Sequence, residues 1–179
     1  MSNFLNRLSG YNKNNVKMNV LGSTTASAGD VIQVDLPTNS IVDLSSLAWA
    51  FQVTYAASGG DGAAHLPINA ESLINRMAVE VNGQTLVNLT NYNVLYHALL
   101  YTTATEDYQQ QRKVAQSNTR SGEASGTCFA AADAAEIREH VIDTWLGFLG
   151  SAKPNFIDTS LLGNVRITIT LANNDIIGG

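Results

Sequence analysis

Residues 47–55 show the clearest pattern in the chain. Large apolar side chains occupy every second position, as Leu47, Trp49, Phe51, Val53 and Tyr55, with Ala, Gln or Thr between them. Successive side chains of a strand point to opposite faces, so this alternation predicts a half-buried strand with one face in a core. The alanines on the other face would let a second sheet edge or a neighbouring subunit pack closely.

Further period-two segments predict an all-β protein. Apolar residues alternate in 31–36, in 77–81 and in 165–171. Asn82-Gly83 is the preferred dipeptide for a two-residue type I′ turn, which predicts a hairpin with a return strand at 84–87. We expect an antiparallel β-sandwich with one or two short helices in its loops.

The period changes after this hairpin. A helix is predicted over 88–101, where an apolar stripe recurs at helical spacing: Tyr92, Leu95, Tyr96, Leu99 and Leu100. Residues 102–127 form a long polar loop of a kind that tends to be functional or disordered. A short helix is predicted over 130–139, a strand over 141–149 and a loop over 154–163.

The first 29 residues differ in charge from the rest. They hold Arg7, Lys13 and Lys17 and no acidic residue; the chain has 10 basic and 15 acidic residues, so 7 and 15 remain, a balance of −8. We expect residues 1–29 to form an extended arm and 30–179 the folded domain, with 22–29 as the connection. Two hypotheses remain for the arm: a disordered terminus with incidental charge, or a segment facing a genome or a membrane.

The composition of the chain excludes several classes of protein. The net charge of −5 disfavours a nucleic-acid binder that uses its whole surface, and charged residues make up only 14%. Such a surface suits either an ordinary neutral β-protein or a subunit that buries much of itself against neighbours. No apolar run is long enough for a transmembrane helix, the start does not read as a secretory signal, and one cysteine, Cys128, excludes an internal disulfide framework.

No pattern in the sequence is typical of catalysis, and we predict no enzyme, no cofactor and no small-molecule substrate. The nearest candidate for a metal site pairs Glu136 with His140 at helical spacing, but a solvated helix end explains the pair better. His65, His97 and Cys128 are expected to be packing or surface residues. Asn88 begins a glycosylation sequon, which short sequences match by chance.

The order of these elements resembles a known family. VIQVDLPTNSIVDLSSLAWAFQV is similar to the opening strands of vertical jelly-roll capsid proteins. LPINAESLINRMAVEVNGQTLVNLTNYNVLYHALL and FLGSAKPNFIDTSLLGNVRITITLANND are similar to that family's hairpin, Tyr-rich helix and later strands. The resemblance spans residues 30–175 and points to the double-jelly-roll major capsid proteins of tailless icosahedral viruses.

The resemblance implies a major capsid protein of the virion, assembled inside the host cell as trimeric, pseudo-hexameric capsomers. Its partners would be other copies of itself and minor capsid proteins. Arg7, Lys13 and Lys17 would lie on an interior-facing arm that touches an internal membrane or the genome, and the loop 102–127 would be exposed or lie between subunits.

One departure leaves alternatives open. A jelly roll has eight strands, and the pattern predicts six or seven before Gly179. The closing strand, and a second jelly roll, would then come from further sequence or from a partner chain. A single-jelly-roll minor capsid or vertex protein and a carbohydrate-binding or adhesion module are the alternatives, followed by an enzyme on a β-sandwich.

Overall fold

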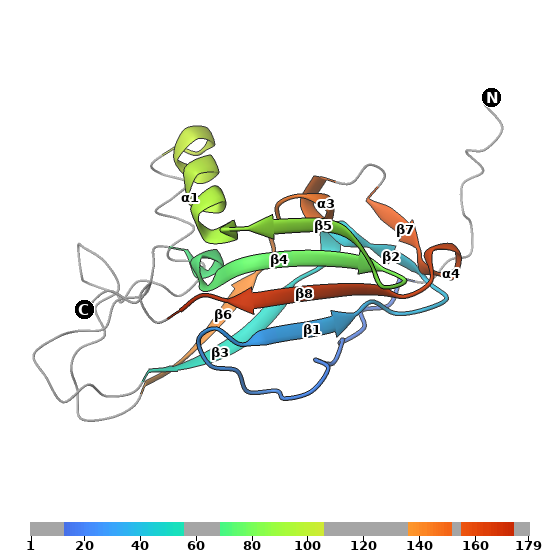
Figure 1. The fold of residues 1–179 in the computed structure, drawn as a ribbon, viewed down its shortest axis with the longest axis horizontal. Coiled ribbons are helices and arrows are strands. Elements are labelled where there is room, and N and C mark those ends of the chain that lie inside the picture. Colours follow the sequence, from blue (N-terminus) through green and yellow to red (C-terminus); the bar gives the residue numbers. More distant parts are fainter. Residues whose placement is uncertain (1–12, 56–68, 106–135, 152–154, 174–179) are drawn as a thin grey trace, which may run out of the picture.

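The computed structural model describes residues 13–55, 69–105, 136–151 and 155–173. Its strands are β1 (Val31–Asp35), β2 (Ile41–Asp43), β3 (Trp49–Tyr55), β4 (Ile74–Val81), β5 (Gln84–Thr90), β6 (Glu136–Ile142), β7 (Phe156–Asp158) and β8 (Val165–Leu171). The helical segments are η1 (Leu44–Ser46), η2 (Ala70–Leu73), α1 (Tyr92–Thr103), α3 (Phe148–Ser151) and α4 (Thr159–Leu162). Figure 1 shows their arrangement.

One layer is a four-stranded antiparallel sheet in the order β1-β8-β4-β5. The alternation predicted for 165–171 is confirmed, since Val165, Ile167 and Ile169 are buried while the residues between them are only partly so. Met77 and Val79 are fully buried on the neighbouring strand β4. These side chains form the sheet's contribution to the core.

Two ribbons, β2 with β7 and β3 with β6, make up the rest of the sandwich. Figure 1 shows β3 and β6 crossing behind the four-stranded sheet. Within the described ranges there are eight strands rather than six or seven. The additional strands β2 and β7 are three residues long, too short for an alternating pattern to reveal.

The strand predicted over 47–55 is confirmed as β3, which begins at Trp49, and its alternation holds over 49–54. Trp49 and Phe51 pack against the core, and the intervening Ala50 and Gln52 are exposed. The predicted strand 31–36 is also present as β1, and Leu36 just beyond it is buried.

The predicted Asn82-Gly83 hairpin is confirmed. Both residues have positive φ, 50° and 79°, as a type I′ turn requires. The return strand β5 runs on to Thr90, so the residues predicted to open a helix at 88 are still in the sheet. The helix α1 starts at Tyr92, after Asn91 in a left-handed conformation.

Two predictions for the second half of the chain are wrong. Residues 136–139 lie in β6 and not in a helix, because all seven residues of β6 pair with β3, and these contacts override the helix propensity of Ala and Glu. The strand predicted over 141–149 ends at Ile142. The chain then turns at Gly147, which has φ of +66°, and enters α3.

The prediction of a loop over 154–163 is also wrong. Its described residues, 155–163, contain the strand β7 and the helix α4. Most of the long polar loop, 106–127, lies outside the described residues, as do the first residues of the helix predicted over 130–139. The segment 22–29 has no regular element and is exposed, in line with a connection.

Candidate functional site

The three arm residues have different positions. Arg7 lies outside the described residues, and Lys17 is exposed. Lys13 forms an ion pair with Asp43 of β2, with 3.3 Å between Lys13 Nζ and Asp43 Oδ2. Farther along the arm, the Leu21 amide donates to the Gln33 carbonyl at 2.8 Å. The arm is therefore attached to the body at several points, which also include a hydrogen bond from the Gly29 amide to the Ala172 carbonyl and the packing of Met18 against the core.

Asp43 belongs to a pair of equivalent turns whose shared capping pattern was not predicted from the sequence. The segments IVDLSSL (41–47) and FIDTSLL (156–162) each run from a short strand into a helical turn. Asp43 accepts hydrogen bonds from the Ser45 amide and hydroxyl, and Asp158 accepts the same pair from Ser160. The repeated Asp-x-Ser spacing, typical of an N-cap, is the signal that could have revealed both turns.

These hydrogen bonds also favour the charged form of the two carboxyl groups. The Ser45 hydroxyl, followed by Lys13, lowers the pKa of Asp43 from its ordinary value. The Ser160 hydroxyl and amide lower the pKa of Asp158. Both carboxylates are therefore negative at neutral pH.

Four exposed apolar residues lie on β2, β7 and α4, the elements at one end of the sandwich in Figure 1. We call this cluster the end patch. Its members and their exposed fractions are Ile41 (62%), Phe156 (59%), Leu161 (85%) and Leu162 (37%). Paired strand residues share a face, so Ile41 lies on the outer side of the ribbon with Asp158, and Phe156 with Asp43.

A second apolar surface covers α1, which projects from the opposite end of the sheet (Figure 1). Of the predicted stripe, Tyr92, Tyr96 and Leu100 are buried. The other two members, Leu95 and Leu99, are 40% and 41% exposed, so only part of the stripe packs in the core. We call the exposed side chains of this helix the α1 face: Val94, Leu95, Leu99 and Tyr101.

The sequence of α1 explains this unusual surface. The helix, YNVLYHALLYTT, contains no Asp, Glu, Lys or Arg. Surface helices normally carry charged residues on the side away from the core. A helix that is apolar on most sides is stable when another surface covers it, which makes the α1 face a candidate contact site.

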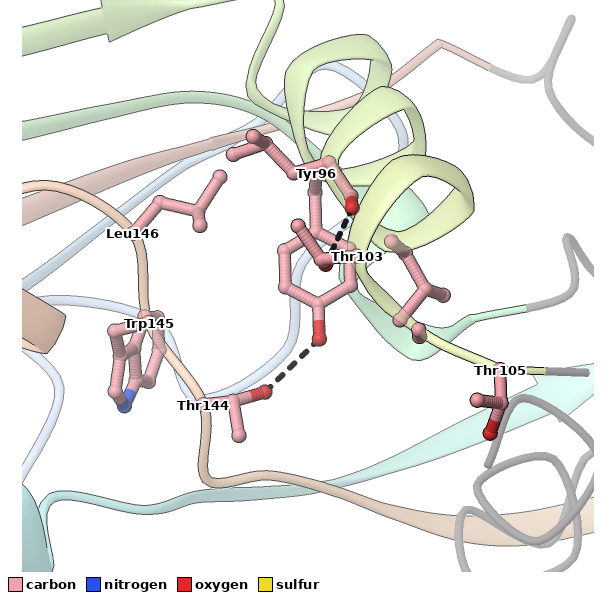
Figure 2. A pocket seen from close by; sticks show the side chains of 9 residues that line it. Tyr96, Thr103, Thr105, Thr144, Trp145 and Leu146 are labelled. Atoms are coloured by element: carbon pink, nitrogen blue, oxygen red, sulfur yellow. Dashed lines mark hydrogen bonds between the residues drawn. The ribbon is translucent and has the colours of Figure 1, made fainter. Parts of the chain in front are cut away.

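A cavity of about 540 Å³ lies where α1 meets the segment after β6 (Figure 2). Its lining consists of Tyr96, Leu99, Leu100, Thr103, Ala104, Thr105, Thr144, Trp145 and Leu146. Figure 2 shows the Tyr96 hydroxyl pointing toward the Thr144 hydroxyl, 3.0 Å away. These side chains offer apolar surface and hydroxyl groups, which can hold a polar or apolar side chain of a neighbouring segment.

The candidate metal pair is not supported. Glu136 and His140 lie on strand β6, where residues four apart are separated by about 13 Å along the chain, too far to share an ion. His140 is buried and stacks on Phe51, with 5.6 Å between ring centroids. Among the described residues no three His, Cys, Asp or Glu side chains gather as metal ligands would.

The remaining candidates lie apart from one another. His97 is half-buried on α1 and packs against the ring of Tyr101 at a tilted angle. Asn88 is exposed on β5 and accepts a hydrogen bond from Arg76 Nε at 2.7 Å. His65 and Cys128 lie outside the described residues. In the part of the chain that is described, no helix is long and apolar enough to cross a bilayer.

Known structures match this arrangement in fold. No protein-family model and no curated protein sequence matches the chain. The chain is similar to a structure described as the PBCV-1 virus capsid, quasi-atomic model, with a TM-score of 0.56 and 14% identity over 88% of this chain and 34% of that one.

It is also similar to PBCV-1 VP54, as fitted into a reconstruction of the virophage Sputnik. Here the TM-score is 0.52 and the identity 16%, over 87% of this chain and 33% of that one. The chain thus spans about a third of the length of the solved chains it matches. This likeness confirms the predicted fold: the chain is an antiparallel jelly-roll β-sandwich like those of viral capsid proteins.

Proposed function

We propose that the chain is a structural protein of a virus capsid, a major capsid protein that acts by self-association and catalyses no reaction. The observation that carries this proposal is the likeness in fold to two capsid structures over most of this chain. The protein would assemble inside the host cell and would then be located in the virion.

The finer features follow from the sequence resemblance and the partial coverage. Residues 30–179 would form one jelly roll, the first of two, because the matched chains are about three times as long as the matched region. Trimeric, pseudo-hexameric capsomers are the expected assembly. Minor capsid proteins, an internal membrane or the genome would be further partners, the last two through Arg7, Lys13 and Lys17.

The α1 face is the surface that best fits contact between copies. Each copy has a net charge of −5, so identical copies repel one another wherever charged surfaces meet. The side chains of the α1 face carry no carboxylate or ammonium group that would have to be buried without a partner. Two copies can therefore meet there at the lowest electrostatic cost.

Native mass spectrometry and electron microscopy of the purified protein test the proposal. We expect trimers and larger assemblies for the wild type. Val94→Asp places a charge on the α1 face and should raise the protein concentration needed for assembly at least tenfold. Thr38→Asp, on an exposed loop, should leave that concentration unchanged. A wild-type chain that stays monomeric at all concentrations would contradict the proposal.

A further inference from the structure

The end patch is an apolar surface with a defined charge pattern. Leu161, at 85%, is the most exposed large apolar side chain of the described residues. Phe156 and Ile41 continue the surface across the outer side of β2 and β7. Apolar side chains gathered in this way are typical of contact sites.

The charges around the end patch restrict its partner. Asp43 and Asp158 share its outer side, as the cross-strand partners of Phe156 and Ile41. If two copies met patch to patch, the two Asp158 carboxylates would come together beside the two Lys13–Asp43 ion pairs, and like charges at such distances oppose contact. The patch therefore fits a partner that is apolar, basic and free of acidic groups.

The chain itself supplies a segment of this chemistry, and the described residues show where it joins. Residues 1–12, MSNFLNRLSGYN, include five large apolar side chains (Met1, Phe4, Leu5, Leu8 and Tyr11), one base (Arg7) and no acid. They end next to Lys13, whose ammonium group already pairs with Asp43 beside Phe156. Twelve residues span at most about 40 Å, which is ample for a patch that begins at this ion pair.

We propose that the end patch is the binding site of the first twelve residues of the same chain, which cover Leu161 and Phe156 with their apolar side chains. In the free subunit Arg7 is the partner of the Asp158 carboxylate, as Lys13 is of Asp43; the membrane or genome contact proposed above would belong to the assembled capsid. The arm then shields Leu161, the most exposed large apolar side chain of the described residues, in the free subunit. This inference does not depend on the capsid role, because it concerns a single copy.

Site-specific photo-crosslinking of the full-length chain tests the contact. A benzophenone side chain is placed at position 161 in one protein and at position 94, on α1 at the other end of the molecule, in a control (Figure 1). Mixing unlabelled and ¹⁵N-labelled protein before irradiation separates links within a chain from links between copies. We expect position 161 to link to residues 1–12 of the same chain and position 94 not to.

Crosslinks from position 161 to another copy, or to any segment other than residues 1–12, would overturn the proposal. Failure to assemble, in contrast, would contradict the capsid role and leave these crosslinks unchanged. The two proposals can therefore fail separately.

Trypsin cleavage after Arg7 gives an independent measurement. Because both positions are exposed, Leu161→Asp and its control Val94→Asp should leave the fold intact, which circular dichroism checks. We expect Leu161→Asp to speed cleavage about tenfold, the change when a segment bound nine-tenths of the time is released, and Val94→Asp to have no effect. Equal cleavage rates in wild type and Leu161→Asp, or protection only when anionic lipid vesicles are added, would show that the arm binds elsewhere.

Discussion

Gly163 and Asn82 lie in direct contact across two turns that are far apart in the sequence. Asn82 Nδ2 donates to the Leu162 carbonyl at 2.8 Å, and Asn82 Oδ1 accepts from the Asn164 amide at 3.0 Å. A β-carbon at position 163 would overlap Asn82 Oδ1. The hairpin between β4 and β5 thus holds the turn that leads from α4 into β8.

Gly163→Ala should lower the free energy of unfolding by about 3 kcal/mol. Gly163 has φ of 80° and ψ of −143°, a combination open almost only to glycine, and the overlap with Asn82 adds to that cost. Urea denaturation measures the loss. Gly83→Ala is the matched control, since Gly83 has φ of 79° but open space around it, and should cost about 1 kcal/mol.

A double-mutant cycle isolates the contact itself. If the overlap contributes, Gly163→Ala combined with Asn82→Ala should be less destabilising than the sum of the two single changes. Strict additivity would show that the cost at position 163 comes from the backbone alone.

Tyr92→Phe should destabilise the fold through loss of the hydrogen bond to the Leu146 amide. Tyr92 is fully buried, and its hydroxyl accepts from the Leu146 amide at 3.0 Å. Removing the oxygen leaves that amide without this acceptor, at a cost of about 1–2 kcal/mol. Chemical denaturation should show this loss for Tyr92→Phe and almost none for Tyr101→Phe, whose ring is 58% exposed. Equal stability of the two variants would show that the hydroxyl of Tyr92 does not stabilise the fold.

The sequence predicted the fold class because its largest signals came from the core faces of long strands. Residues 47–55 and 165–171 alternate over seven or more positions, and Asn82-Gly83 has a conformational requirement that few other dipeptides meet. These features are local, so a single stretch of sequence is enough to reveal them.

Contacts distant in sequence decided the elements that were predicted wrongly. Helix propensity favours a helix over 136–139, but pairing with β3, more than eighty residues away, makes it a strand. The short strands β2 and β7 exist because they pair with each other. The end patch and the α1 face could not be predicted from the sequence either. Leu95 and Leu161 cannot be distinguished from core leucines by residue type, and only the fold determines that they are exposed.

Thr144→Val should loosen the junction between α1, η2 and the segment after β6. The Thr144 hydroxyl bonds to the Tyr96 hydroxyl at 3.0 Å and donates to Glu71 Oε1 at 3.1 Å (Figure 2 shows the first bond). Valine has the same shape but cannot make either bond, so we expect a loss of about 1–3 kcal/mol in unfolding free energy. Thr144→Ser, which keeps the hydroxyl, should recover most of it. A stable valine variant would mean that packing alone holds the junction.

The N-cap carboxylates should make the fold sensitive to acid. The pKa of Asp158 is lowered in the folded chain by the Ser160 hydroxyl and amide, whereas the unfolded carboxyl titrates at about 3.9. A group of this kind stabilises the fold fully above its unfolded pKa, and this contribution is lost as the pH falls through the lower, folded pKa. The urea midpoint of the wild type should therefore fall as the pH drops below about 4. Asp158→Asn, which can still accept the capping bonds but does not titrate, should show a flatter profile in this range. An identical acid profile for the two proteins would show that the cap of α4 does not depend on the charge of Asp158.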